Sequence, residues 1–470
     1  MYLAERLAEF SVDVRKRRPP AEAMDAARLR LLDGLGVALA ALGCASVVRP
    51  RSALGLFGNA GPASAVGHAE PRPVAAAAVQ NGLLMHGLEY DDTHIGAVVH
   101  GAPVILPAVL AIAERDGQSG EEVLAAICVG WEVLARIGAP LRGALQAHGF
   151  QATSVAGPLA AAAAVAHLSE MDARRTTHAL GIAGSQSSGV FEFLQAGATS
   201  KMLHGGWAAM GGLVAAGLAA DGMTGPASIL EGRSGLFAAF ARNPELGPRM
   251  QARLGDLGER WAVTESRPKV APCCHYIQAF LEALAALKEK GLRAADVRAI
   301  RCLVDPRQAQ LICEPWAEKL NPPNGYAAKW SLPYCLAALA LRGKLTTELF
   351  EGPMDADLLD YARRIDWTAQ ENGFPDRYAG CLIVTLADGT QLESAVSDVL
   401  GAPSRPFPED ALIEKFKTCA AAALTPDATA GLLQEIQGLA GASSLARLGG
   451  YLRSARATAP QRTRATAAVS

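Results

Sequence analysis

Ionisable side chains gather most densely in one short segment. Residues 81–107 read NGLLMHGLEYDDTHIGAVVHGAPVILP. The twelve consecutive residues 89–100 within this segment include Glu89, Asp91, Asp92, Thr93, His94 and His100. Unpaired charges beside apolar stretches are costly, which favours a functional use for them. The simpler interpretation is a helix end followed by an Asp–Thr turn with solvated carboxylates. A metal site is a third possibility, but His94 and His100 lack the i, i+4 spacing of a helical zinc site.

A second segment, ATSKMLHGGWAAMGG at 198–212, combines cations with small residues. Lys201 and His204 precede a glycine pair and open a predicted helix, where backbone N–H groups and a cation would converge on a bound anion. This arrangement suits a substrate carboxylate. The alternative is a capping segment with an exposed lysine, which is the more frequent setting for a lysine taken alone.

Two further segments contain candidate residues. In SRPKVAPCCHYIQAFLEAL, Lys269 stands between two prolines, which stiffen the chain and fix where the lysine points. Cys273 and Cys274 lead into an apolar helix, so packing explains them better than a thiol nucleophile does. In AAKWSLPYCLAALAL, Tyr334 lies at the start of an apolar helix, where a core position is the default although its hydroxyl could reach a cleft.

These segments must be positioned by a chain whose first half is helical in pattern. From Ala21 to about Glu265, apolar residues recur at three- and four-residue spacing among many glycines and alanines. Small residues let helix backbones approach closely, so residues 1–265 predict a tightly packed all-α domain. The N-terminal residues alternate charge with apolar side chains, unlike a secretory signal, and are interpreted as a first helix.

The pattern changes near Pro268. Segments 297–306 and 380–396 are rich in β-branched residues, and Asp388-Gly389 predicts a hairpin turn in the second. Because helical stretches lie between them, 266–399 predict a smaller α+β lid domain. Helical periodicity then resumes, so 400–453 should complete the first domain, and 454–470 predict a disordered tail. The expected fold class is mostly α, a large all-α helical domain plus the α+β lid.

Composition argues against several classes of protein. The 44 basic and 46 acidic residues give a net charge of -2, which offers no field to attract nucleic acid. The most apolar stretches, 157–168 and 211–222, are shorter than the roughly 20 residues that span a bilayer, so no membrane segment is predicted. The nine cysteines form no Cys-x-x-Cys, which predicts neither disulfides nor a metal cluster and favours a reduced cytoplasm. Dinucleotide and P-loop signatures are absent.

In their order and spacing the segments resemble the MmgE/PrpD family along nearly the whole chain. The residues that carry the resemblance are RLRLLDGLGVALAAL, EYDDTH, GAVVHGAPVILPA, SKMLHGG, KVAPCC and AKWSLPYCLAAL. The resemblance implies a helical domain built from both chain ends, an inserted α+β lid, a homodimer, and an active site between the domains. It also implies an enzyme that needs neither metal nor cofactor.

The resemblance assigns roles to individual residues. His100 matches the loop histidine and would act as general acid and base, while Lys201 and Lys269 match two lysines that would hold carboxylates. Asp92 and Thr93 would orient these groups, and Tyr334 matches the lid tyrosine.

The chain departs from the family pattern at three places. Glu89 stands where the family commonly has aspartate, and Gln151 follows Gly-Phe where it commonly has histidine. Glutamine can hydrogen-bond but cannot exchange a proton near neutral pH. After His100 the loop reads Gly-Ala-Pro instead of beginning Pro-Ser. We expect Glu89, Gln151 and His204 among the substrate-binding residues, with altered specificity.

The expected function is a metal-independent lyase, a dehydratase or decarboxylase, that acts on a small di- or tricarboxylic acid. The reaction would transfer a proton beside a carboxylate. One alternative is an epimerase of a dicarboxylate such as iminodisuccinate, which the changes at Glu89 and Gln151 keep open. Another is a non-enzymatic polycarboxylate-binding protein, which would need the same cations but would tolerate loss of His100.

Overall fold

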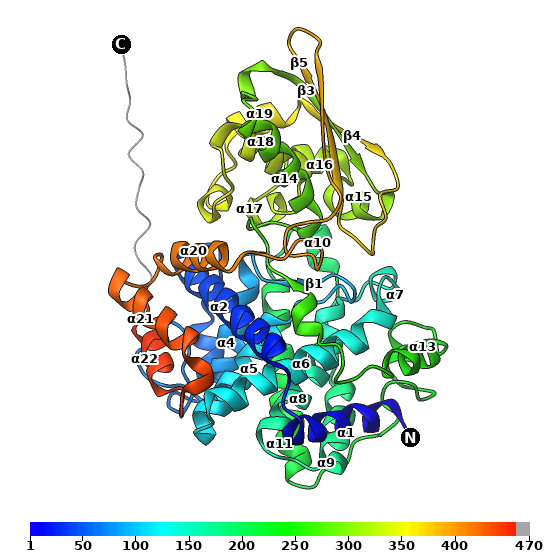
Figure 1. The fold of residues 1–470 in the computed structure, drawn as a ribbon, viewed down its shortest axis with the longest axis vertical. Helices are drawn as coiled ribbons and strands as arrows, with labels where there is room; N and C mark the ends of the chain where they lie inside the picture. Colours follow the sequence, from blue (N-terminus) through cyan, green and yellow to red (C-terminus); the bar gives the residue numbers. More distant parts are fainter. Residues whose placement is uncertain (457–470) are drawn as a thin grey trace.

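The chain folds into a large helical domain with a smaller lid domain standing on one side of it (Figure 1). This computed structural model describes residues 1–456. Each domain has its own hydrophobic core: one lies mainly within 3–263 and 412–455, and the other lies mainly within 271–399. The protein is therefore mostly helical with a small mixed sheet in the lid, which confirms the predicted fold class.

Long helices with small residues build the helical domain. They are α1 (Leu3–Lys16), α2 (Ala21–Gly43), α4 (Val74–Gly87), α5 (Ala102–Asp116), α6 (Gly120–Leu141), α8 (Ala152–Leu168), α9 (Ala173–Ser185) and α11 (Lys201–Ala220). A Cβ on Gly212 of α11 would lie 2.4 Å from the Cβ of Ala161 in α8, and one on Gly206 would lie 2.3 Å from the carbonyl oxygen of Val79 in α4. Glycine is therefore required where α11 crosses its neighbours.

Shorter helices connect these long ones. They are α3 (Arg51–Gly55), α7 (Ala144–Ala147), α10 (Glu192–Ala196), α12 (Leu236–Ala239), α13 (Leu246–Arg253) and η1 (Ala262–Glu265).

The C-terminal segment returns to the helical domain. Helix α20 (Glu409–Ala420) packs against α2, and Lys415 Nζ lies 2.7 Å from Asp33 Oδ1 across this contact. The chain continues through α21 (Pro426–Gln437), η4 (Leu439–Gly441) and α22 (Ala446–Ser454), coloured orange to red in Figure 1. Of the predicted tail, Ser454 still belongs to α22 and Ala455 is buried, while 457–470 lie outside the described residues.

The lid is built on a four-stranded sheet in the order β4-β3-β5-β6. Its strands are β3 (Val297–Val304), β4 (Ile365–Ala369), β5 (Gly380–Leu386) and β6 (Gln391–Val396). β3 pairs with β4 in parallel and with β5 antiparallel, while β5 and β6 form the predicted antiparallel hairpin. Gly389 has φ 90° in the turn, a conformation that glycine adopts without strain, so this prediction is confirmed.

Helices cover the lid sheet. Helix α14 (His275–Glu289) contacts β5 and β6 and packs against α18 (Leu332–Arg342). Smaller elements complete the domain: η2 (Ala294–Asp296), α15 (Pro306–Ile312), α16 (Trp316–Leu320), α17 (Gly325–Ala328), η3 (Thr347–Phe350) and α19 (Ala356–Ala362).

A short two-stranded sheet connects the loop after α4 with the segment that leads into the lid. β1 (Thr93–His94) pairs antiparallel with β2 (Ser266–Arg267), with Thr93 opposite Arg267. The sequence pattern predicted helices throughout 21–265, but residues 93–94 form the strand β1. Local periodicity could not indicate this strand, because its pairing partner lies more than 170 residues away along the chain. This pairing brings the two chemistry-bearing segments together.

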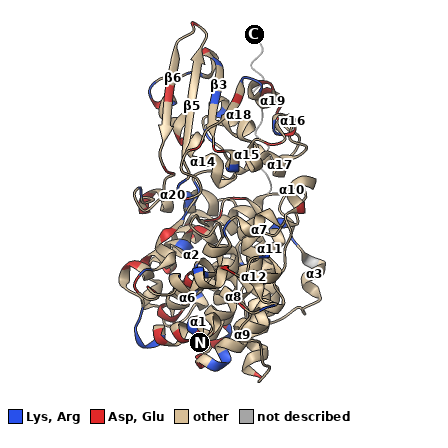
Figure 2. Cartoon of the chain, turned by 90° about the vertical axis from the view of Figure 1, so that its right-hand side faces the viewer, with Lys and Arg blue, Asp and Glu red and all other residues tan. Residues whose placement is uncertain are grey.

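Within residues 1–456, two helices, α6 and α11, have the length and apolar composition of a membrane span. Within the most apolar window of each, 83% of the residues in α6 and 56% of those in α11 are buried in the protein. Such burial is typical of core helices, and we treat both as such. Acidic and basic side chains are interspersed over both domains (Figure 2).

Candidate active site

A cavity lies between the two domains. The helical domain contributes Glu89, Thr93, Val98, His100, Gln146, Gln151, Ala152, Phe191 and Lys201 to its wall. The lid contributes Lys269, Cys274, His275, Tyr276, Leu311, Trp330 and Tyr378. Most of the sequence-predicted residues therefore face one space, which has cations and imidazoles on some sides and aromatic rings on others.

The β1–β2 pairing explains how distant residues meet here. Helix α4 ends at Gly87, Glu89 follows its C-cap residue, and β1 begins at Thr93. Since β1 pairs with β2, Lys269 emerges from β2 directly beside the turn at Glu89. The Lys269 ammonium donates to the Glu89 carbonyl oxygen at 2.8 Å.

Glu89 is paired with the two lysines predicted to bind substrate. Its Oε1 accepts hydrogen bonds from the Lys201 ammonium and, at 3.0 Å, from the Tyr326 hydroxyl. Its Oε2 lies 3.7 Å from Lys269 Nζ. Burial alone would raise the pKa of Glu89, but the charges of Lys201 and Lys269 lower it to about 2. Glu89 is therefore ionised and divides its charge between two cations.

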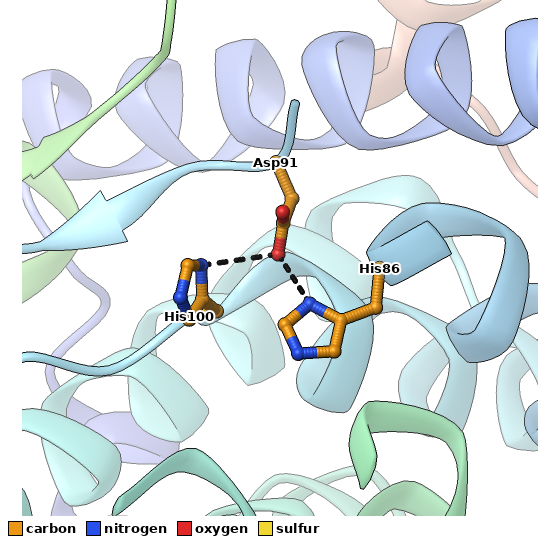
Figure 3. A group of neighbouring side chains, drawn as sticks. All are labelled: His86, Asp91 and His100. Atoms are coloured by element: carbon orange, nitrogen blue, oxygen red, sulfur yellow. Dashed lines mark hydrogen bonds and ion pairs between the residues drawn. The ribbon is translucent and has the colours of Figure 1, made fainter. Parts of the chain in front are cut away.

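His100 is held by acceptors from the same loop (Figure 3). Its Nδ1 lies 2.8 Å from the Asp92 carbonyl oxygen and 3.1 Å from Asp91 Oδ2. A carbonyl oxygen can only accept, so Nδ1 carries the proton and Nε2 is the nitrogen available to exchange one. The backbone N–H of His100 donates to Thr153 Oγ1 at 3.0 Å, which fixes the loop against α8. This is the arrangement of an oriented general base.

Asp91 also holds a second imidazole. His86 Nδ1 lies 2.7 Å from Asp91 Oδ2, and both side chains are fully buried (Figure 3). Burial, with the charge of Lys201 next, lowers the pKa of His86 to about 4, so its ring is neutral near pH 7. Burial would raise the pKa of Asp91, but His100, His86 and Lys269 hold it well below its ordinary range. Asp91 is therefore a carboxylate that stabilises positive charge on His100.

The donor atoms of His86, Asp91 and His100 lie within 4.8 Å of one another, close enough to surround a metal ion. The nitrogen–oxygen distances of 2.7 and 3.1 Å are also those of two N–H···O hydrogen bonds. The ammonium of Lys269, 3.8 Å from Asp91 Oδ1, already supplies positive charge. The metal-independent mechanism proposed below uses the hydrogen-bonded arrangement, and for it turnover should survive exhaustive chelation. Activity lost with EDTA and restored by a divalent ion would contradict that mechanism.

Gly101, the departure that follows His100, has a packing reason. A Cβ at this position would lie 2.2 Å from the ring of Trp131 in α6. No other residue fits without moving the tryptophan, so the loop sequence and α6 are matched to each other.

Three predicted residues contribute less directly. Thr93 lines the cavity, and its buried hydroxyl has no partner among the described residues. Gln151 also lines the cavity, but its Oε1 accepts the N–H of Ser154 at 2.8 Å and caps α8. His204 lies outside the cavity wall, with its ring 5.7 Å from that of Phe193.

Besides His204, two predicted residues are not brought to the cavity wall. The carboxylate of Asp92 accepts hydrogen bonds from the Ala102 N–H at 3.0 Å and from the Ser266 hydroxyl, so only its backbone carbonyl serves His100. Tyr334 is fully buried in the lid and donates to the Leu349 carbonyl oxygen at 3.2 Å. Its hydroxyl is used in packing the domain, as the default for a core tyrosine suggests.

Sequence reasoning missed several cavity residues. Trp330 lines the cavity, with Lys201 Nζ 5.1 Å from its ring centroid, and Tyr326 lies outside the wall but bonds to Glu89. Both come from the run NGYAAKW just before Tyr334. The four-residue spacing of Tyr326 and Trp330, next to the segment that contains Tyr334, was the sequence feature that could have indicated them. His275 begins α14 and lines the cavity, and neither of its buried ring nitrogens has a partner among the described residues. Burial holds the pKa of His275 well below its usual value.

Comparison with known proteins gives matches over both domains. The model of the MmgE/PrpD N-terminal domain matches residues 5–249, and that of the MmgE/PrpD C-terminal domain matches 271–438. A cis-aconitate decarboxylase-like protein of Aspergillus oryzae is 27% identical over 89% of this chain and 90% of its own. Cis-aconitate decarboxylase of Aspergillus terreus is 26% identical over 85% and 86%, and that of Mus musculus is 27% identical over 80% and 78%, respectively.

Proposed function

Because this chain belongs to the MmgE/PrpD family, we propose that it is a metal-independent lyase acting on a small di- or tricarboxylic acid. The observation that carries the proposal is the fixed orientation of His100, whose Nδ1 is engaged by Asp91 and the Asp92 carbonyl beside two buried lysines. The cis-aconitate decarboxylases among the relatives favour carbon–carbon cleavage over dehydration.

The proposed chemistry follows from these groups. Lys201 and Lys269 would hold substrate carboxylates and stabilise negative charge that develops next to them. In decarboxylation the carbon–carbon bond breaks, its electron pair stays on the carbon skeleton, and protonated His100 donates a proton there as carbon dioxide leaves. In dehydration His100 Nε2 removes the proton beside the carboxylate, the C–H electrons form the double bond, and the C–O bond breaks as protonated His100 returns the proton to the hydroxyl, which leaves as water.

An epimerase is the second candidate, and His275 favours it. His275 comes from the lid and His100 from the helical domain, yet both line one cavity. Epimerisation requires a proton to leave one face of a carbon and return to the other, and two imidazoles from opposite domains suit that task.

Proton NMR in deuterated water can separate these functions. The protein is incubated with cis-aconitate, methylcitrate and iminodisuccinate in turn. Loss of carbon dioxide or water supports a lyase, whereas deuterium incorporation with inversion supports an epimerase. His100→Asn should abolish most of either reaction, since general acid–base catalysis contributes about 10²–10⁴-fold. Binding without any reaction or exchange would support the polycarboxylate-binding protein instead.

We also propose that the protein is a homodimer, as the family resemblance suggests, and that it works in the cytoplasm. Helix α11 offers a suitable surface for the second copy. Leu203, Trp207 and Val214 are 40%, 45% and 42% exposed and recur at helical spacing along one face. Burying such a stripe against its symmetry-related copy would remove apolar surface from water.

A further inference from the structure

Three consecutive backbone carbonyl groups after α4 are each bound by a buried lysine. Each ammonium donates a hydrogen bond to its carbonyl oxygen, and the pairs are Lys329 with Leu88 at 2.9 Å, Lys269 with Glu89 at 2.8 Å, and Lys415 with Tyr90 at 3.0 Å. The three lysines are at most 9% exposed. They lie 241, 180 and 325 residues along the chain from the carbonyl groups that they bind. The lid and the C-terminal helix α20 therefore both meet the helical domain at this turn, residues 88–90.

The backbone of the turn needs such support. The last carbonyl groups of an α-helix have no N–H partner within the helix, and they carry the negative end of its dipole. Leu88 is the C-cap residue of α4, and Glu89 follows it with φ 57°, a left-handed conformation that glycine adopts far more readily. A disfavoured conformation persists only where surrounding contacts hold it. Ammonium groups on successive carbonyl oxygens supply those contacts.

Lys329 contacts the turn rather than the space for a substrate. It comes from the lid, just before α18, and it is not among the described residues that line the cavity. Burial lowers its pKa to about 8, so the side chain is still mostly protonated at pH 7. A buried ammonium is unfavourable unless it is well paired. Here the Leu88 carbonyl oxygen and the Phe350 ring, whose centroid lies 5.2 Å from Nζ, provide the pairing.

Lys415 holds the neighbouring peptide group from α20. Besides its bond to the Tyr90 carbonyl oxygen, its Nζ lies 2.7 Å from Asp33 Oδ1 and 3.8 Å from the centroid of the Tyr90 ring. The Tyr90 hydroxyl donates to the Val270 carbonyl oxygen at 3.2 Å, so Tyr90 is fixed at its backbone and at its ring. The Tyr90 carbonyl group belongs to the planar peptide that leads into Asp91. Lys415 thus fixes the direction in which Asp91 leaves the turn.

The turn carries two carboxylates of the site. Glu89 pairs with the cavity lysines, and Asp91 Oδ2 lies 3.1 Å from His100 Nδ1. Misplacing a positioned group by about 1 Å can reduce a rate by about 10²-fold. Lys415, like Lys329, lies outside the described cavity wall. Each of them therefore acts on the site through the turn.

We infer that Lys329 and Lys415 are positioning residues, which fix the turn at 88–90 and so aim the carboxylates that it carries. This inference rests on the proposed function in taking His100 as the group that moves the proton. It adds two residues on which turnover depends although neither contacts the substrate.

Hydrogen–deuterium exchange and steady-state kinetics test the inference together. One variant is Lys329→Met, which keeps the length of the side chain and removes its charge and its donors. The other is Asp33→Asn/Lys415→Met, because the Asp33 carboxylate would otherwise be buried without its cation. In both variants we expect peptides that span 88–92 to exchange at least about 10-fold faster than in the wild type, since a hydrogen bond from a charged donor is lost.

Turnover is measured on whichever of cis-aconitate, methylcitrate and iminodisuccinate the wild type converts. For both variants we expect kcat to fall by at least about 10-fold while KM changes by less than about 3-fold, because a misdirected Asp91 no longer supports His100 in the transition state.

Lys288→Met is the matched control. Lys288 Nζ donates to the Ala340 carbonyl oxygen at 2.7 Å in the last turn of α18, so it makes the same kind of bond within the lid alone. Its replacement should lower the free energy of unfolding and leave both kcat and the exchange at 88–92 unchanged.

The outcomes separate failure of the inference from failure of the proposed function. Wild-type exchange at 88–92 in a folded variant would overturn the inference, and so would faster exchange with the wild-type kcat, which is the result of a purely structural role. An equal fall of kcat in Lys288→Met would overturn it as well. A wild type that converts none of the three acids would overturn the proposed function, whereas the exchange data would still show whether the lysines hold the turn. If neither variant folds, the wild type decides, since exchange at 88–92 as fast as in an unstructured peptide would overturn the inference without any substitution.

Discussion

Replacing Asp91 by Asn tests whether this buried carboxylate stabilises the protonated form of His100. The substitution keeps the size of the side chain and removes a negative charge 3.1 Å from His100 Nδ1. At that distance, an effective dielectric constant of roughly 20–80 gives an attraction of about 1–5 kcal/mol. Since about 1.4 kcal/mol corresponds to a factor of ten in rate, we expect turnover to fall by about 10- to 10³-fold.

The loss should remain smaller than that caused by His100→Asn. The Asp92 carbonyl, 2.8 Å from Nδ1, still selects the tautomer with the proton on that nitrogen. Asp91→Asn therefore weakens the base without removing it. Asp91 also contacts His86, whose Nδ1 lies 2.7 Å from Asp91 Oδ2. The fold of each variant is therefore checked by circular dichroism and thermal unfolding.

The assay is the dependence of kcat and KM on pH, measured with the substrate identified by NMR. For Asp91→Asn we expect kcat to be lower at every pH, while KM changes little. Asp92→Asn is the matched control, because the Asp92 carboxylate bonds to Ala102 and Ser266 and should affect stability more than the pH profile. A folded Asp91→Asn protein with the wild-type kcat and pH profile would refute this reasoning.

Three other predictions concern parts of the molecule outside the cavity. Trp207→Asp should convert the proposed dimer to a monomer in light scattering, because it places a charge in the apolar stripe; a wild-type protein that is itself monomeric at micromolar concentration would contradict the dimer. Burial lowers the pKa of His167 from 6.5 to about 4, so its stabilising contribution is present above pH 6.5 and is lost as the pH falls towards 4. In urea denaturation, the free energy of unfolding of the wild type should therefore fall by about 2 kcal/mol between pH 7.5 and 5.0, and this fall should be absent in His167→Gln. Equal pH dependence of the two proteins would contradict this role of His167. Tyr334→Phe removes the bond to the Leu349 carbonyl, so it should cost about 1 kcal/mol of stability and leave turnover unchanged; a large loss of turnover in the folded variant would return Tyr334 to the site.

The sequence alone determined the elements whose formation depends on local pattern. The first helix, the small-residue helices and the hairpin at Asp388-Gly389 could be predicted because periodicity and turn chemistry act over a few residues. The segments that line the cavity were also recognisable, since ionisable residues between apolar stretches are unusual. Lys201, Lys269 and His100 all line one cavity as the sequence suggested.

The tertiary structure alone decided how those residues pair. Asp91 and Asp92 are adjacent, yet Asp91 contacts His100 whereas the Asp92 carboxylate bonds to Ser266. Their directions depend on the pairing of β1 with β2, which joins segments more than 170 residues apart. Glu89 likewise meets Lys201 across 112 residues of chain. Such pairings arise from the packing of whole domains, and local sequence carries no record of which neighbour a buried charge will find.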